Sequence, residues 1–139
     1  MGKLTKEEII LLFLENPNKL ADEILNENVP KSDEIRTLIC DLGDPRCAYL
    51  YAKWVDESSH SDTRQGVCKD PHYAYLYAEY VDKSLRSDTR KASCKNPGWA
   101  YNYAQNVDKS PHPDTRRATC KDPYWKEAYE RWENSLKKK

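Results

Sequence analysis

The chain has 139 residues, enough to bury a hydrophobic core without disulfides or metal. Its 23 basic and 23 acidic residues balance, so it lacks the basic footprint of a general nucleic-acid binder. No apolar run approaches the roughly 20 residues of a membrane span, and the first residues lack the basic-then-apolar layout of a signal peptide. We therefore expect a cytoplasmic protein with no membrane segment.

A short helical hairpin is predicted at the start of the chain. Thr5 and Glu8 form a capping box before an apolar run, which indicates a helix start. Asn16-Pro17 supplies a stop and a new start, because Asn is a good N-cap and Pro suits the first helical position. The predicted helices cover residues 6–15 and 18–26, within an N-terminal capping hairpin over residues 1–31.

An internal repeat begins after this hairpin. The signature Arg-x-x-x-Cys recurs at intervals of 28, 26 and 26 residues. Its copies are Arg36/Cys40, Arg64/Cys68, Arg90/Cys94 and Arg116/Cys120. After each copy an Asp or Asn precedes a Pro, a pair that starts a second helix. Each unit therefore holds a short and a long helix, predicted over residues 63–69 and 71–83 in the second copy.

This period is typical of a solenoid, in which each unit buries its apolar face against its neighbours. We predict an all-α fold, a short α-solenoid of about five stacked hairpins and ten helices. It would be a single helical-repeat domain over residues 1–139, with repeats over 32–121 and a C-terminal capping helix over 122–139. Alanines in the long helices would let successive helices approach closely: Ala48/Ala52, Ala74/Ala78 and Ala100/Ala104. Lys126 and Glu130 replace them in the last unit, which suits a helix with nothing stacked beyond it.

Four cysteines share one repeat position, and this regularity argues against a disulfide or a zinc site. Equivalent positions in stacked helices lie about 8–10 Å apart, too far for either. We expect half-buried apolar side chains, and we expect Cys47, which is off this register, to be the most reactive thiol. No nucleophile-base pair, carboxylate pair or Gly-rich phosphate loop emerges. The sequence thus predicts no catalytic residue, metal or cofactor, and no enzymatic activity.

Charged residues recur around the turn of each hairpin. The repeated positions are Asp62/Asp88/Asp114, Arg64/Arg90/Arg116 and Asp56/Asp82/Asp108. In a structural interpretation, the first Asp caps the short helix and the Arg pairs with the Asp that ends the previous long helix. The alternative is a ladder of charges that binds a ligand.

A column of tyrosines supplies the candidate partner-binding surface. Tyr49, Tyr75 and Tyr101 occupy the same position in three long helices, at the edge of the apolar face. We expect their rings to be partly exposed as a ridge, since Tyr is favoured at interfaces. The candidate residues are Tyr49, Lys53, Tyr75, Glu79, Tyr101 and Gln105. Alternatively, these rings complete the packing between long helices.

The phrase Lys-Asp-Pro-x-x-Ala-Tyr-x-Tyr-Ala-x-x-Val-Asp, read over residues 69–82, is specific to the repeat. It resembles uncharacterised short helical-repeat proteins of bacteriophages and large viruses, with units of 26 residues, and the match covers residues 32–132. The resemblance implies a phage origin and expression in the host cytoplasm. Many small phage proteins act by binding host or defence machinery.

We therefore expect a non-enzymatic, protein-binding helical-repeat module, with a phage-encoded inhibitor of a host defence complex as the specific form of that hypothesis. Two alternatives stay open. One is a nucleic-acid or nucleotide-binding module that stacks bases on Tyr and Trp. The other is a self-associating virion or assembly scaffold, so a homo-oligomer is compatible with the sequence.

Overall fold

The computed structural model describes residues 2–138, and within them the chain is helical with no strand. These residues form ten α-helices in which neighbouring helices pack as pairs, so the predicted all-α stack of helical hairpins is confirmed. Contacts along the chain cluster into two compact units, residues 1–69 and residues 70–139. The repeat signature runs through both units.

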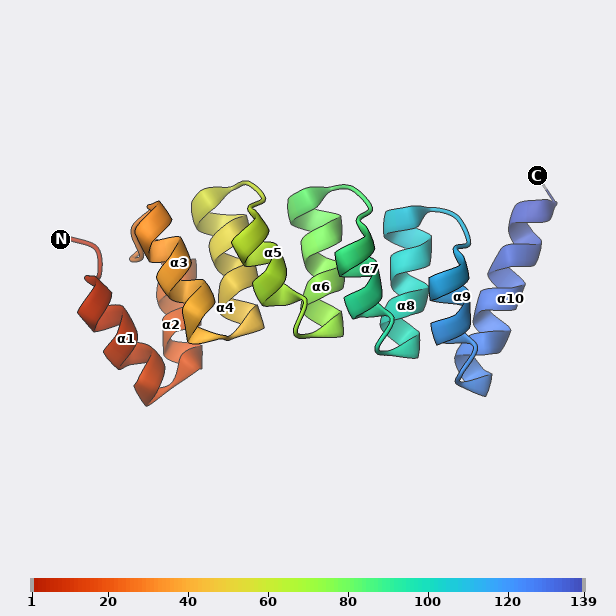
Figure 1. The fold of residues 1–139 in the computed structure, drawn as a ribbon, viewed down its shortest axis with the longest axis horizontal. Helices are drawn as coiled ribbons and strands as arrows, with labels where there is room; N and C mark the ends of the chain where they lie inside the picture. The colour runs from red at the N-terminus through yellow and green to blue at the C-terminus, as the bar shows by residue number, and fades with distance from the viewer. Residues whose placement is uncertain (1, 139) are drawn as a thin grey trace. The chain divides into compact units, whose positions relative to one another are not determined.

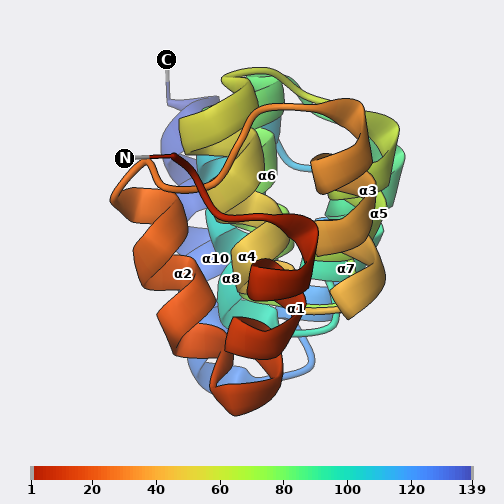
Figure 2. The same ribbon diagram turned by 90° about the vertical axis from the view of Figure 1, so that its left-hand side faces the viewer.

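The first unit contains the N-terminal hairpin and the first repeats. Its elements are α1 (Lys6–Glu15), α2 (Pro17–Leu25), α3 (Asp33–Leu42), α4 (Pro45–Leu50), η1 (Tyr51–Asp56) and α5 (Ser61–Val67). Helix α1 packs against α2 and α3, and α4 packs against α2, α3 and α5. Figure 2 shows α3 and α5 on one side of this unit, and α2 and α4 on the other. The short and long helices thus form two layers.

The second unit repeats this arrangement with more regular spacing. Its elements are α6 (Pro71–Tyr77), η2 (Ala78–Asp82), α7 (Ser87–Ser93), α8 (Pro97–Tyr103), η3 (Ala104–Asp108), α9 (Pro113–Thr119) and α10 (Pro123–Lys137). Helix α7 packs against both α6 and α8, and α9 packs against both α8 and α10 (Figure 1). Within this unit, α7 and α9 therefore each join two successive long helices.

Local capping sets most helix starts close to their predicted positions. The capping box is present: the Thr5 hydroxyl accepts from the Glu8 N–H at 3.2 Å, and Glu8 Oε1 accepts from the Thr5 N–H at 2.9 Å. Helix α1 covers Lys6–Glu15 as predicted. Helix α5 starts two residues before its predicted position because its N-cap is His60. Asp62 is therefore not the predicted N-cap residue, but its Oδ1 atom accepts a hydrogen bond from the Thr63 N–H in the first turn at 2.8 Å.

Three long helices change from α to π geometry in their second half. The π-helical turns η1, η2 and η3 are followed by the C-cap residues Glu57, Lys83 and Lys109, whose φ angles of 53°, 53° and 57° are left-handed. A π-turn takes more residues than an α-turn, so it rotates the side chains that follow. In an ideal α-helix Tyr80 would lie on the same side as Tyr77, three residues earlier, but within η2 Tyr80 is 47% exposed whereas Tyr77 is fully buried.

A second tyrosine position of the repeat is buried in the core of each unit. Tyr51, Tyr77, Tyr103 and Tyr129 occur at one repeat position and are fully buried. The alanine positions in the long helices are buried as predicted, and Ala78 packs in one cluster with Tyr75 and Tyr103. This tyrosine position was not among the predicted features. The available signal was that the position is Tyr in all four copies, whereas the candidate ridge ends at Glu127.

Candidate functional site

The expected exposed ridge of tyrosines is not present. Tyr49 is 6% exposed and Tyr75 is 7% exposed, and Tyr101 is half-buried. The ring of Tyr75 stacks on Trp99 with centroids 5.5 Å apart, and its hydroxyl accepts a hydrogen bond from Asn106 Nδ2 at 2.9 Å. The exposure prediction is therefore wrong for Tyr49 and Tyr75. The alternative, that these rings complete the packing, describes Tyr75 correctly.

Tyr101 repeats this packing one hairpin later. Its ring centroid lies 5.8 Å from Trp125, 6.1 Å from Tyr129 and 6.3 Å from Trp132, all on α10. An aromatic cluster of this kind contributes more than its buried area, because edge-to-face and tilted ring pairs add favourable electrostatics. Tyr101 thus joins α8 to α10 and keeps part of its ring at the surface.

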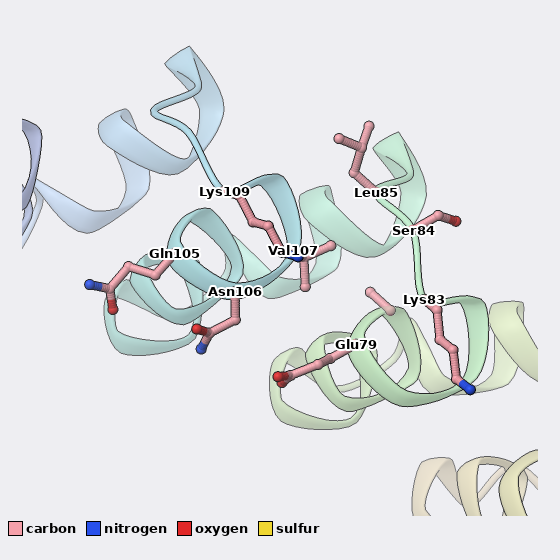
Figure 3. A pocket seen from close by; sticks show the side chains of 9 residues that line it. Glu79, Lys83, Ser84, Leu85, Gln105, Asn106, Val107 and Lys109 are labelled. Carbon is pink, nitrogen blue, oxygen red and sulfur yellow. The ribbon is translucent and has the colours of Figure 1, made fainter. Parts of the chain in front are cut away.

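A hollow lies between the π-helical turns of neighbouring long helices in the second unit. It has a volume of about 660 Å³. Figure 3 shows its lining, in which Glu79 and Asn106 extend from the two helices toward the same part of the hollow. Lys83, Leu85, Val107 and Lys109 also line it. The hollow therefore contains both charge signs beside apolar side chains.

Glu79 is the residue with unused hydrogen-bonding capacity in this hollow. Its carboxylate shares a hydrogen bond with the Tyr75 hydroxyl, but its Oε2 atom is buried and has no hydrogen-bond partner among residues 2–138. Burial, and secondarily the Glu79 carboxylate, raise the pKa of Tyr75, so this phenol stays protonated. A buried acceptor without a donor is costly.

A second hollow adjoins the first on the same long helix. It has a volume of about 290 Å³ and lies between η3 and α10. Tyr101, Gln105, Arg131 and Trp132 are among its lining residues. Gln105 lines both hollows, so it forms the ridge between them. We call the set Glu79, Tyr101, Gln105, Asn106, Arg131 and Trp132 the Gln105 surface.

The remaining two candidates lie in the first unit. Lys53 Nζ lies 5.0 Å from the ring centroid of Trp54 and 5.8 Å from that of Tyr49. Trp54 is 52% exposed and was not among the predicted site residues. The structure therefore gathers Glu79, Tyr101 and Gln105 around the two hollows. It places Lys53 beside an exposed Trp instead.

Arg90 and Arg116 pair with acidic residues that follow them in the chain. Arg90 donates to both carboxylate oxygens of Asp108, at 3.0 Å and 2.6 Å. The prediction that this Arg pairs with the Asp of the previous long helix is wrong, because its partner ends the following one. Arg116 likewise pairs with Glu133 of α10 at 3.2 Å. The separation in sequence between the Arg and its acidic partner shortens from 18 residues to 17, because α10 has no π-turn equivalent to η3.

The cysteine expectations are only partly confirmed. Cys40, Cys68, Cys94 and Cys120 are half-buried as predicted. Cys47, expected to be the most reactive, is 1% exposed, and its Sγ lies 3.8 Å from the Pro17 carbonyl oxygen. Burial raises the pKa of the Cys47 thiol to about 12. A thiol that is buried and protonated is a poor nucleophile, so the reactivity prediction is wrong.

The chain is an all-α helical-repeat protein by its fold. No family model, curated protein or solved structure matches it. Between residues 2 and 138, no group of three or more His, Cys, Asp or Glu side chains is placed to hold a metal ion. In the same part of the chain, each helix is too short or too polar to cross a bilayer.

Proposed function

We propose that this protein is a protein-binding helical-repeat module and that the Gln105 surface contacts its partner. The observation that carries the proposal is the pair of hollows, about 660 Å³ and 290 Å³, on either side of Gln105. Protein interfaces are anchored by a few side chains that fill such depressions. Partner side chains would enter the two hollows on either side of Gln105.

The charges of this surface favour a protein over a nucleic acid. Stacking of bases needs exposed aromatic faces beside a positive groove. Here Tyr75 is buried, Glu79 adds a negative charge next to Lys83 and Lys109, and Arg131 is paired with Glu127 at 2.8 Å. A partner with both donor and acceptor side chains fits this mixture better than a phosphate backbone does.

The resemblance to phage repeat proteins directs the choice of partner. On that basis we propose that the protein acts without catalysis, by occupying a surface of a host protein, and that components of defence complexes are the first to test. Self-association as a scaffold is the competing hypothesis. A light-scattering mass of one chain would argue against it, and a mass that rises with concentration would favour it.

The experiment compares two substitutions of the same kind. Gln105→Arg places a long charged side chain between the hollows, and Gln65→Arg makes the same change at an exposed position of α5. Immobilised wild-type protein is used to capture partners from host lysate, and the affinity of each captured protein is then measured. We expect Gln105→Arg to weaken binding by about tenfold or more, and Gln65→Arg to leave it unchanged. Equal affinities for the two variants, with both folded, would refute the assignment to this surface.

A further inference from the structure

Helix α1 is apolar on more sides than the first unit covers. It has six consecutive apolar residues, from Ile9 to Leu14. Ile9 is fully buried against the rest of the unit, whereas Leu11 is 67% exposed and Leu14 is 73% exposed. Helices with apolar side chains all round are normally buried all round. Figure 2 shows α1 at the face of the first unit that is turned toward the viewer.

Acidic side chains surround the exposed leucines. On a helix, the neighbours of a residue lie three and four positions away. For Leu11 these are Glu7, Glu8, Leu14 and Glu15, and the three glutamates are exposed. Lys19 pairs with Glu15 at 2.5 Å, so the acidic excess lies with Glu7 and Glu8. The exposed strip of α1 is therefore two leucines with an acidic border.

A hollow beside α1 extends this acidic character. It has a volume of about 380 Å³ and is lined by Lys6 of α1 and by Asp33, Glu34, Thr37, Leu38 and Asp41 of α3. The single Lys is already paired with Glu34 at 2.5 Å. Residues 1–42 hold nine acidic and five basic residues, a net charge of −4 in a chain whose total is zero. This end of the first unit thus combines apolar and negative surface.

We propose that α1 and the adjoining hollow along α3 bind an amphipathic helix of a partner protein, whose apolar side covers Leu11 and Leu14 and whose flanking residues are Lys or Arg. Recognition of an amphipathic helix by an apolar strip with complementary charges at its borders is a common mode of peptide binding. This surface belongs to the first unit and contains no residue of the Gln105 surface. The proposal is therefore independent of the proposed function.

The border charges disfavour the other occupants of such a strip. In an antiparallel pair formed with a second copy, Glu7 of one chain would approach Glu15 of the other, and like charges are destabilising. An anionic membrane surface attracts basic helices and would be repelled by Glu7 and Glu8. A basic amphipathic helix would cover the two leucines with its apolar side and pair its basic side chains with the glutamates.

The test uses the whole chain and two labelled synthetic peptides, one a Leu/Lys amphipathic helix and the other the same helix with Glu in place of Lys. Binding is followed by fluorescence anisotropy at several salt concentrations. We expect the Leu/Lys peptide alone to bind, and its affinity to fall as salt rises. Tight binding of the Leu/Glu peptide, or no binding of either peptide, would overturn the proposal.

Two variants of α1 separate this interaction from general attraction between charges. Leu11→Gln combined with Leu14→Gln should weaken binding by about tenfold or more, although both side chains are exposed and the fold should persist. Glu7→Lys combined with Glu15→Lys should reverse the preference toward the Leu/Glu peptide. Leu136→Gln, at an exposed leucine of the second unit that lines neither hollow, is the matched control and should bind as the wild type does.

Two further measurements test whether a second copy of the chain or a membrane covers Leu11 and Leu14 instead. A light-scattering mass of two chains that returns to one chain in the Leu11→Gln, Leu14→Gln variant would overturn the proposal in favour of a second copy. Binding to phosphatidylserine vesicles that is lost in the same variant would overturn it in favour of a membrane. A mass of one chain, with no binding to vesicles, is the expected result.

Discussion

The Tyr103 hydroxyl lies 2.8 Å from the Thr89 hydroxyl, at the point where the short helix α7 begins. It also accepts from the Arg86 N–H at 3.0 Å. The same arrangement recurs one repeat later, where the Tyr129 hydroxyl lies 2.9 Å from Thr115 Oγ1. Backbone groups at a helix start lack partners within the helix. Each of these rings therefore crosses the core of the second unit and satisfies the start of the preceding short helix.

Removing one of these hydroxyl groups should destabilise the protein. Tyr103→Phe would remove this partner from the buried Thr89 hydroxyl and from the partly buried Arg86 N–H, a loss of about 1–3 kcal/mol. Urea unfolding followed by circular dichroism gives the difference. Tyr124→Phe is the control, because Tyr124 is 72% exposed and should change little. Equal effects of the two substitutions would contradict the role of the buried hydroxyl.

The ion pairs made by Arg90 and Arg116 should contribute differently to the free energy of unfolding, because one is buried and the other is exposed. The side chains of Arg90 and Asp108 are 9% and 3% exposed, whereas that of Arg116 is 48% exposed. Asp108→Ala leaves a buried guanidinium unpaired and should destabilise by about 3–5 kcal/mol. Glu133→Ala removes the partner of the more exposed Arg116 and should destabilise much less, because water screens an exposed ion pair. Denaturant titration of both variants measures the contrast, and a larger effect at Glu133 would be the contrary result.

A larger side chain at the repeat position of Ala78 should be tolerated only in α10, the last helix. Ala78 is fully buried in the cluster with Tyr75 and Tyr103, so Ala78→Leu should destabilise by about 1–3 kcal/mol through overpacking. Glu130 occupies the same repeat position in α10 and is only half-buried. Glu130→Leu should therefore change stability little. Thermal melts of both variants measure the difference. If both substitutions lowered the melting temperature equally, the close helix contact would not be specific to Ala78.

Stability should fall as the pH rises above about 9. Burial raises the pKa of the thiols of Cys40 and Cys47 to about 12 and that of Cys94 to about 11, compared with 9.0 for an exposed thiol. In this range the folded chain keeps protons that the unfolded chain has lost. The free energy of unfolding therefore decreases as the pH rises from 9 through the folded pKa values.

The measurement is chemical denaturation at neutral pH and at about pH 10.5, where the linkage should be visible. Cys47→Ala should make the loss of stability with pH smaller, because it removes one of the groups that bind a proton more tightly in the folded state. A variant that loses stability as steeply as the wild type would show that this thiol contributes nothing to the pH dependence.

The sequence by itself determined where the helices lie and that they repeat. Thr5, Asn16 and the Asx-Pro pairs act on backbone groups two or three residues away, so their effect can be inferred without a fold. The repeat of Arg and Cys at a fixed interval predicts equivalent hairpins in the same way. The alanines were also predicted correctly, since a small side chain at one position in successive helices indicates close contact.

Only the tertiary structure decided which side chains are covered and which remain at the surface. Tyr75 was predicted to be exposed from its place on its own helix, but Trp99 of the next long helix covers it. Cys47 was predicted to be reactive, but it lies against Pro17 of α2. The Arg90–Asp108 pair depends on the π-turn η3, which adds a residue to the turn. Each of these outcomes depends on a neighbouring hairpin, because burial and pairing are set by what packs across the helix rather than along it.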